Sequence, residues 1–306
     1  MLRVLVLGVP RSGTTWIGEV LGRCDGASYV HEPDGVHEPF GFVARSALPP
    51  GFCLSPNEQC RAYESLWAGA FAGGAKATTL VDHAARRLYA GVTTEQRARV
   101  RNGGSPTSRL RLASRLARPR TAVPGLDAVV VKSVDAALTA EWIAQRFNPN
   151  VVVVQRDLRS VLASWITLDM AGPQQRNYEV LTDFARSWWD VELPGYGVSK
   201  VVRSAVVCSV WSIALSTAAA RHDWTVLRYE DAAVDPEAQF RRVAESCSLS
   251  FGDRALGFLN DSNRPGSGYS TQRVAGSTID SWKERLDAEQ VTAIETVVAC
   301  FPASLR

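Results

Sequence analysis

Short apolar runs alternate along the chain with longer segments in which apolar residues recur at helical spacing. The runs are dense in Val and Leu without alternating polar positions, which is typical of parallel strands covered on both faces. They comprise residues 2–9, 127–132, 151–155 and 224–229, with a shorter run at 27–30. The helical segments comprise residues 14–23, 57–72, 138–147, 158–170, 179–190, 204–221 and 236–247. This order predicts a single α/β domain over residues 1–306, with a central parallel β-sheet covered by helices on both faces.

The composition is that of an ordinary globular protein. Of the 306 residues, 46% are hydrophobic and 21% are charged, which excludes a disordered chain, a collagen-like fibre and a disulfide-stapled miniprotein. The net charge of +3 is too small to indicate a nucleic-acid partner, so we expect none.

Cysteine usage and hydropathy predict a cytoplasmic protein. The six cysteines are scattered without a CxxC pair, which favours free, buried thiols in a reducing compartment and argues against a zinc site. The apolar run at residues 1–9 breaks at Pro10-Arg11 without the features of a signal peptide. The apolar stretch at 205–220 contains four hydroxyl residues and falls short of a membrane span, so we expect a buried helix there.

One segment departs from the average charge. Residues 86–120 contain ten Arg and a single acid, Glu95, and so carry a charge of +9. We expect residues 86–125 to form an insertion near a substrate-binding site. The favoured interpretation is a solvated, partly mobile segment. The alternative is a cover over the active site that attracts an anionic substrate, or a peripheral contact with an anionic membrane.

The strongest local signal is a strand, turn and helix over residues 5–16. Gly8 and Gly13 have the GxxxxG spacing of a phosphate-binding loop, and the turn directs backbone N–H groups and a helix N-terminus at one point. The Lys of an ATP-binding loop is replaced by Thr14, and Arg11 supplies positive charge inside the loop instead. The sequence therefore predicts a phosphate cradle that is a poor ATP loop.

Four motifs in order resemble the sulfotransferases that use 3′-phosphoadenylyl sulfate (PAPS). The segment 10–16 resembles their 5′-phosphosulfate loop, and the segment 151–165 resembles their 3′-phosphate motif. Residues 227–231 resemble their Tyr-Glu-Asp strand end, and Arg273 to Gly276 with Trp282 downstream resemble their C-terminal nucleotide loop. The resemblance implies a P-loop-like sulfotransferase fold, PAPS as donor, and adenosine 3′,5′-bisphosphate (PAP) as product. The nucleotide-binding residues that it implies are Arg11, Ser12, Gly13, Thr14, Thr15, Trp16, Arg156, Ser164, Tyr229, Arg273 and Gly276.

The residues themselves agree with a 3′-phosphate site. Arg156 follows a strand at the edge where open α/β sheets bind ligands, and Ser164 lies about two turns along the next helix. A guanidinium and a hydroxyl in these places could hold one phosphate from two sides.

The general base distinguishes branches of this family. The cytosolic branch uses a His just after a strand-end Lys, but here Lys132-Ser133 is followed by Val134. In carbohydrate-type and several bacterial branches a Glu after the first helix serves, and His31-Glu32-Pro33 resembles that segment. We therefore expect Glu32 as the base, with His31 as the alternative, and Lys132 together with Arg11 to stabilise the leaving group.

The expected acceptor is a hydroxyl or amine on a small molecule, a carbohydrate or a glycolipid. No metal is expected, since His31 and His37 are six residues apart and lack the one-face spacing of a zinc helix. Trp188-Trp189 fits either a stacking face for a sugar or the core.

Two other functions remain open at this point. A P-loop kinase using ATP and Mg²⁺ would share the fold, although the strand at 151–155 ends in Gln-Arg rather than a magnesium-binding acid. A non-enzymatic adaptor would use the Arg-rich segment to bind an anionic surface. A serine hydrolase is excluded because the chain has no GxSxG elbow.

Overall fold

The computed structural model describes residues 1–73, 79–101, 103–118, 125–170, 175–262 and 279–305. Five strands form one parallel sheet in the order β2-β3-β1-β4-β5. They are β1 (Leu2–Leu7), β2 (Ala27–His31), β3 (Ala128–Ser133), β4 (Asn150–Gln155) and β5 (Thr225–Arg228). The predicted parallel α/β sheet is confirmed, and its β1–β4 switch point lies where such sheets bind ligands.

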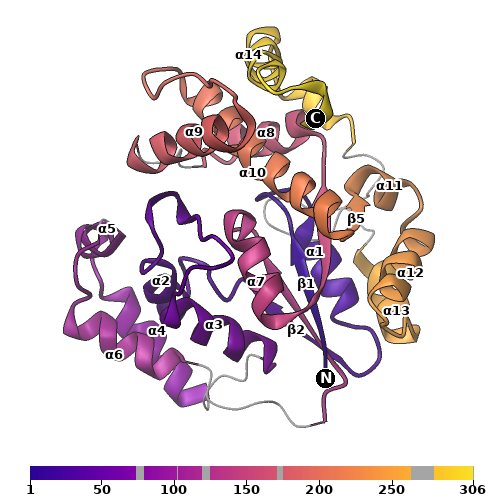
Figure 1. Cartoon of the computed structure of the whole chain (residues 1–306). Helices are drawn as coiled ribbons and strands as arrows, with labels where there is room; N and C mark the ends of the chain where they lie inside the picture. The colour runs from indigo at the N-terminus through magenta and orange to yellow at the C-terminus, as the bar shows by residue number, and fades with distance from the viewer. Residues whose placement is uncertain (74–78, 102, 119–124, 171–174, 263–278, 306) are drawn as a thin grey trace.

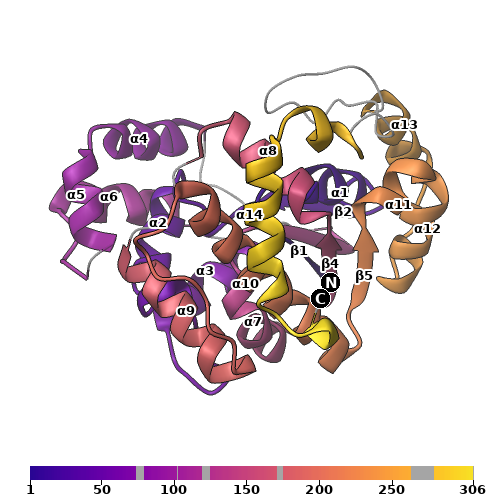
Figure 2. The ribbon, with the colours of Figure 1, turned by 90° about the horizontal axis from the view of Figure 1, so that it is seen from above.

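Helices cover both faces of this sheet (Figures 1 and 2). One face packs against α1 (Thr14–Leu21), α11 (Tyr229–Val234), α12 (Pro236–Ser246) and α13 (Asp253–Ser262). The other packs against α3 (Arg61–Phe71), α7 (Ala140–Phe147) and α10 (Lys200–His222). Successive strand residues such as Val130 and Val131 enter opposite cores, which explains their continuous apolar runs.

A third core lies where α10 meets three further helices. These are α8 (Leu158–Thr167), α9 (Gln175–Trp189) and α14 (Ala288–Ala299). The helix and strand ranges predicted from periodicity agree with the structure to within four residues at each end. Periodicity did not predict α2 (Pro39–Arg45), α11, α13 or α14.

Helix α10 differs from its prediction in length. It has 23 residues, so by length and composition alone it could cross a membrane, and the expectation that this stretch falls short of a span is wrong. Its residues nevertheless contribute to the cores on both sides of it, with Leu215 and Ala219 against the sheet and Val206 and Val210 against α8, α9 and α14. The prediction of a buried helix is confirmed.

The Arg-rich segment, predicted as a solvated and partly mobile insertion, is helical over most of its described residues. It forms α4 (Thr79–Ala90), α5 (Thr94–Arg101) and α6 (Ser108–Ala117), which lie at one side of the molecule, opposite α11–α13 (Figures 1 and 2). A small separate core explains this order. Its buried members are Phe42, Tyr89, Val92, Val100, Leu110 and Ala113. The arginines of α4, α5 and α6 therefore belong to helices that enclose apolar residues.

All six cysteines lie in described residues and are free. Four are buried as expected, whereas Cys53 is half-buried and Cys300 is exposed. Burial raises the pKa of the Cys53 thiol to about 11, so this half-buried thiol is protonated and unreactive at neutral pH.

Candidate active site

The phosphate loop occupies residues 8–13, between the carboxyl end of β1 and the first turn of α1. Gly13 caps the helix in the left-handed region with φ of 96°, and Arg11 adopts φ of 72°. A positive φ is uncommon for an arginine, and such conformations gather at functional sites. Ser12 is fully buried, and its hydroxyl has no hydrogen-bond partner in the described part of the chain. The loop thus holds a buried hydroxyl and a guanidinium at a helix N-terminus, which together suit an anion.

Three predicted nucleotide residues meet at Arg11. Arg11 Nε donates to Ser164 Oγ at 2.9 Å, and Arg156 Nη1 donates to the Arg11 carbonyl at 3.0 Å. The Arg156 guanidinium also lies 4.1 Å from the centre of the Tyr229 ring. These residues come from the phosphate loop, the end of β4, α8 and the start of α11. The fold therefore gathers two arginines and a hydroxyl at one edge of the sheet, as an anionic ligand requires.

Trp16 lies in the core next to this cluster. Its ring makes edge contacts with Tyr229 and Phe240, and its Nε1 donates to Ser262 Oγ at 2.8 Å. The side chain is only 7% exposed. Binding of the nucleotide by Trp16 stays a prediction. In the structure the buried Trp16 indole packs α1 against α12 and α13.

The candidate base Glu32 forms an ion pair with Lys132. Their backbones are also joined, since Glu32 N donates to the Lys132 carbonyl at 2.8 Å. Lys132 is almost completely buried and Glu32 is a quarter exposed, so the carboxylate offsets a charge that would otherwise be buried alone. Glu32 adopts φ of 40°, a second non-glycine residue in the left-handed region at this site.

His31, the alternative base, points toward solvent. Its side chain is 52% exposed, and its Nδ1 is hydrogen-bonded to the Tyr29 hydroxyl at 2.9 Å. Partial burial and the nearby Lys132 ammonium lower the pKa of the imidazole, so His31 is neutral at neutral pH. Its Nε2 lies 3.8 Å from Glu32 Oε2, which leaves both candidates on the same side of the site.

Comparison with known proteins decides the family. The sequence profile described as the sulfotransferase family matches residues 3–253, which is most of the chain. This chain belongs to the sulfotransferase family. No curated protein gives a match.

Solved structures similar to this sulfotransferase share little sequence with it. The sulfotransferase domain from the curacin biosynthetic pathway has 13% identity, with 96% of each chain covered and a TM-score of 0.48. The sulfotransferase domain of the Synechococcus olefin synthase also has 13% identity, with 97% and 94% covered and a TM-score of 0.47. Retinol dehydratase, solved with androsterone and the inactive cofactor PAP, has 15% identity, with 97% and 79% covered and a TM-score of 0.41.

The fourth motif of the sulfotransferase lies outside the described residues, because Arg273 and Gly276 fall within 263–278. Trp282 is described, and its ring lies 4.3 Å from the Arg159 guanidinium. Arg159 is held in turn by Asp157 at the start of α8. The segment after the undescribed residues is therefore fixed to the helix that carries Ser164.

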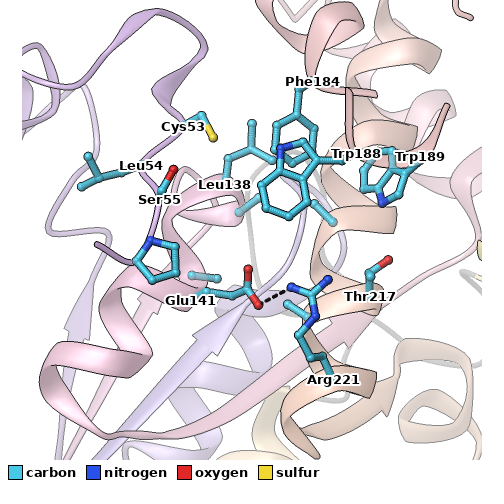
Figure 3. A pocket seen from close by; sticks show the side chains of 15 residues that line it. Cys53, Leu54, Ser55, Leu138, Glu141, Phe184, Trp188, Trp189, Thr217 and Arg221 are labelled. Atoms are coloured by element: carbon cyan, nitrogen blue, oxygen red, sulfur yellow. Dashed lines mark hydrogen bonds and ion pairs between the residues drawn. The ribbon is translucent and has the colours of Figure 1, made fainter. Parts of the chain in front are cut away.

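A surface pocket with aromatic walls lies between α7, α9, α10 and the segment 53–56 (Figure 3). The ring of Trp188 stacks on Phe184 with centres 5.5 Å apart, and Trp188 is 54% exposed. At the opposite side of the pocket Glu141 pairs with Arg221 at 2.8 Å, as the dashed line shows. Trp189 packs against the core that contains Phe301. Both tryptophans thus line the pocket, and Trp189 also packs against the core that supports α9.

Two acidic residues of the site were missed by sequence reasoning. Asp34 and Asp135 follow the ends of β2 and β3, two and three residues after Glu32 and Lys132. The signal that could have found them is position, because carboxyl ends of neighbouring parallel strands meet at one edge of the sheet.

Replacement of Gly13 by Ala is expected to weaken PAP binding by about tenfold or more. A Cβ at this position would overlap the Tyr229 ring, and an L-residue at φ of 96° is strained, so the loop and Tyr229 must both shift. Calorimetric titration with PAP measures the effect. Gly257→Ala is the control, since a Cβ there meets open space in α13. Unchanged affinity in Gly13→Ala would show that the loop does not hold the nucleotide.

Proposed function

We propose that this sulfotransferase moves the sulfuryl group of PAPS to a hydroxyl or amine of a small-molecule, carbohydrate or glycolipid acceptor. The observation that carries the proposal is the meeting of Arg156, Ser164 and the phosphate loop at Arg11. It supplies two guanidinium groups, one hydroxyl and a helix N-terminus to a ligand with phosphate at both the 3′ and 5′ positions.

The site fits such a donor. The hydroxyl of Ser12 is buried without a partner among the described residues, and a phosphate oxygen is an acceptor that would satisfy it. A Cβ on Gly8 would press against Ser12 Oγ, so only glycine leaves that hydroxyl in place. When bound, PAPS supplies an activated sulfuryl group whose leaving group is the phosphate of PAP. Among the described residues no group of three His, Cys, Asp or Glu side chains is arranged to bind a metal.

Glu32 and Lys132 account for the proton and the charge. Glu32 Oε1 is engaged by Lys132 Nζ, so Oε2 is the oxygen we assign to accept the proton of the acceptor group. Lys132 then remains as an uncompensated, buried ammonium once Glu32 is protonated. That positive charge, with Arg11, opposes the negative charge that develops on the departing phosphate.

Calorimetric titration with PAP, with AMP, and with ATP plus Mg²⁺ tests the proposal. We expect tight binding of PAP without metal and much weaker binding of AMP, because AMP lacks the 3′-phosphate. Binding of ATP with Mg²⁺ but not of PAP would replace this proposal by the small-molecule kinase. Cytoplasmic location and contact of α4–α6 with an anionic membrane stay predictions.

A further inference from the structure

A buried polar cluster lies directly behind the Glu32–Lys132 pair. Its central member is Asp34, which is fully buried and follows Glu32 by two residues. The hydroxyl of Ser133, the residue after Lys132, lies 2.8 Å from Asp34 Oδ1 and 3.0 Å from Oδ2. The side chains next to the two candidate catalytic groups are therefore bonded to each other.

The direction of these hydrogen bonds is fixed by a backbone donor. Asp135 N donates to Ser133 Oγ at 3.0 Å, so the single hydroxyl hydrogen of Ser133 is left for Asp34. Asp135 itself is held by Arg45 Nη1 of α2 at 2.5 Å. Asp34 thus accepts, and it cannot rotate to another partner without leaving the Ser133 hydroxyl unsatisfied in the interior.

The turn that carries Glu32 depends on few other bonds. Gly35 N donates to the Glu32 carbonyl at 3.0 Å and closes the turn, and Glu32 N bonds to Lys132. The carbonyl of Pro33 packs closely over Gly41 of α2. Among described residues, the Asp34–Ser133 contact is the side-chain link between this turn and the end of β3 besides the Glu32–Lys132 pair itself. Because Glu32 is held at a positive φ, a loosened turn is free to relax away from that conformation.

We propose that Asp34 is a positioning residue that, through Ser133, holds the turn bearing Glu32 against the strand end bearing Lys132 and so sets their ion pair. The importance of Asp34 for turnover rests on the proposed function. The effect of Asp34 on the geometry of the Glu32–Lys132 pair is independent of that function.

The charge state of Asp34 supports this role. Burial raises the pKa of its carboxyl to about 6, and repulsion from Asp135 adds to this, while Arg45 and the Ser133 hydrogen bond act in the opposite direction. The Ser133 hydrogen bond therefore favours the ionised, accepting form of Asp34, and the Ser133 hydroxyl lies within hydrogen-bond distance of both carboxylate oxygens. Tyr63 of α3 donates to Oδ2 at 3.2 Å from the other side, and it is also bonded to Thr139.

Ser133 and Tyr63 give a matched pair of variants. Ser133→Ala and Tyr63→Phe each delete one buried hydroxyl bonded to Asp34, but only Ser133 joins the turn to β3. The probe is reductive methylation with formaldehyde and borohydride, read by mass spectrometry on the Lys132 peptide. Lys200 and Lys283 are exposed and serve as internal references. Only a neutral amine reacts, so a well-set ion pair protects Lys132.

We expect Ser133→Ala to raise the methylation rate of Lys132 about fivefold or more relative to the references, which is the factor for one ordinary hydrogen bond. The kcat for sulfate transfer from radiolabelled PAPS should fall by a similar factor, with little change in the KM for PAPS. Water is present in every assay as a fallback acceptor beside a panel of phenols and sugars. Tyr63→Phe should lower the melting temperature without moving either readout more than about twofold.

A second variant separates position from charge. Asp34→Asn keeps an acceptor oxygen for Ser133 and should preserve most of the protection of Lys132, whereas Asp34→Ala should remove it. Equal changes in Ser133→Ala and Tyr63→Phe, or unchanged Lys132 methylation in Ser133→Ala, would overturn the proposal. Methylation is measured without nucleotide, so loss of PAP binding in the wild type would contradict the proposed function and leave this test intact.

Discussion

The Glu32→Gln variant is expected to lose sulfuryl transfer by about 10²- to 10⁴-fold, the usual contribution of a positioned general base. The amide is nearly isosteric and its oxygen still accepts from Lys132, but it cannot take a proton from the acceptor. PAP affinity should change little, because Glu32 is joined to Lys132 and not to the Arg11 cluster. Transfer from radiolabelled PAPS and calorimetric titration with PAP measure the two effects on the same preparation.

Two variants of the same segment control this experiment. Glu38→Gln removes a carboxylate six residues away that pairs with Arg86 at 2.9 Å, and transfer should be retained. His31→Ala removes the alternative base, and it should leave most of the activity because its imidazole points toward solvent. Full turnover in Glu32→Gln together with its loss in His31→Ala would assign the base to His31.

Arg156→Ala is expected to weaken the binding of PAP by about 10- to 100-fold and the binding of AMP far less. The guanidinium supplies charge-assisted hydrogen bonds worth about 1.5–3 kcal/mol, and the 3′-phosphate that would receive them is absent from AMP. Calorimetric titration with both nucleotides gives the ratio of the affinity lost for PAP to the affinity lost for AMP. The comparison also corrects for any movement of the loop, since Arg156 supports the Arg11 carbonyl in the absence of nucleotide.

Arg159→Ala is the matched control for Arg156. It removes a guanidinium from the first turn of the next helix, where the side chain is engaged by Asp157 and lies over Trp282. We expect Arg159→Ala to reduce the binding affinity for PAP and for AMP by the same small factor. If Arg156→Ala weakened the two nucleotides equally, Arg156 would be a support of the phosphate loop and not a contact of the 3′-phosphate.

The phosphate loop and the Glu32–Lys132 ion pair differ in how far the sequence alone predicted them. The phosphate loop is local, because a strand, a glycine turn and a helix follow one another within sixteen residues and their geometry needs no distant contact. Glu32 and Lys132 are 100 residues apart, and only the register of β2 against β3, which pairs His31 with Lys132, brings them together. The resemblance to the sulfotransferase family predicted roles for Glu32 and for Lys132 separately. It did not predict that the two side chains form an ion pair.

Charge alone did not reveal the helices of the Arg-rich segment. Ten arginines in residues 86–120 favour a solvated segment, yet α4 and α6 enclose Tyr89 and Leu110 against Phe42 of α2. Sparse apolar residues suffice when a neighbouring element completes their core, and one helix of the set, α2, is itself too short to be found by periodicity. Tyr89 also bonds to the Val36 carbonyl at 2.5 Å, which ties these helices to the segment that follows Glu32.

By itself the sequence determined the parallel α/β sheet, the phosphate loop and the strand ends that carry Lys132 and Arg156, because hydrophobic period and glycine spacing act over short stretches of chain. The tertiary structure decided which side chains meet. Arg11 with Ser164, Glu32 with Lys132, and Asp34 with Ser133 lie 153, 100 and 99 residues apart. Strand order and register set these contacts, and both depend on the packing of the whole sheet rather than on any local pattern.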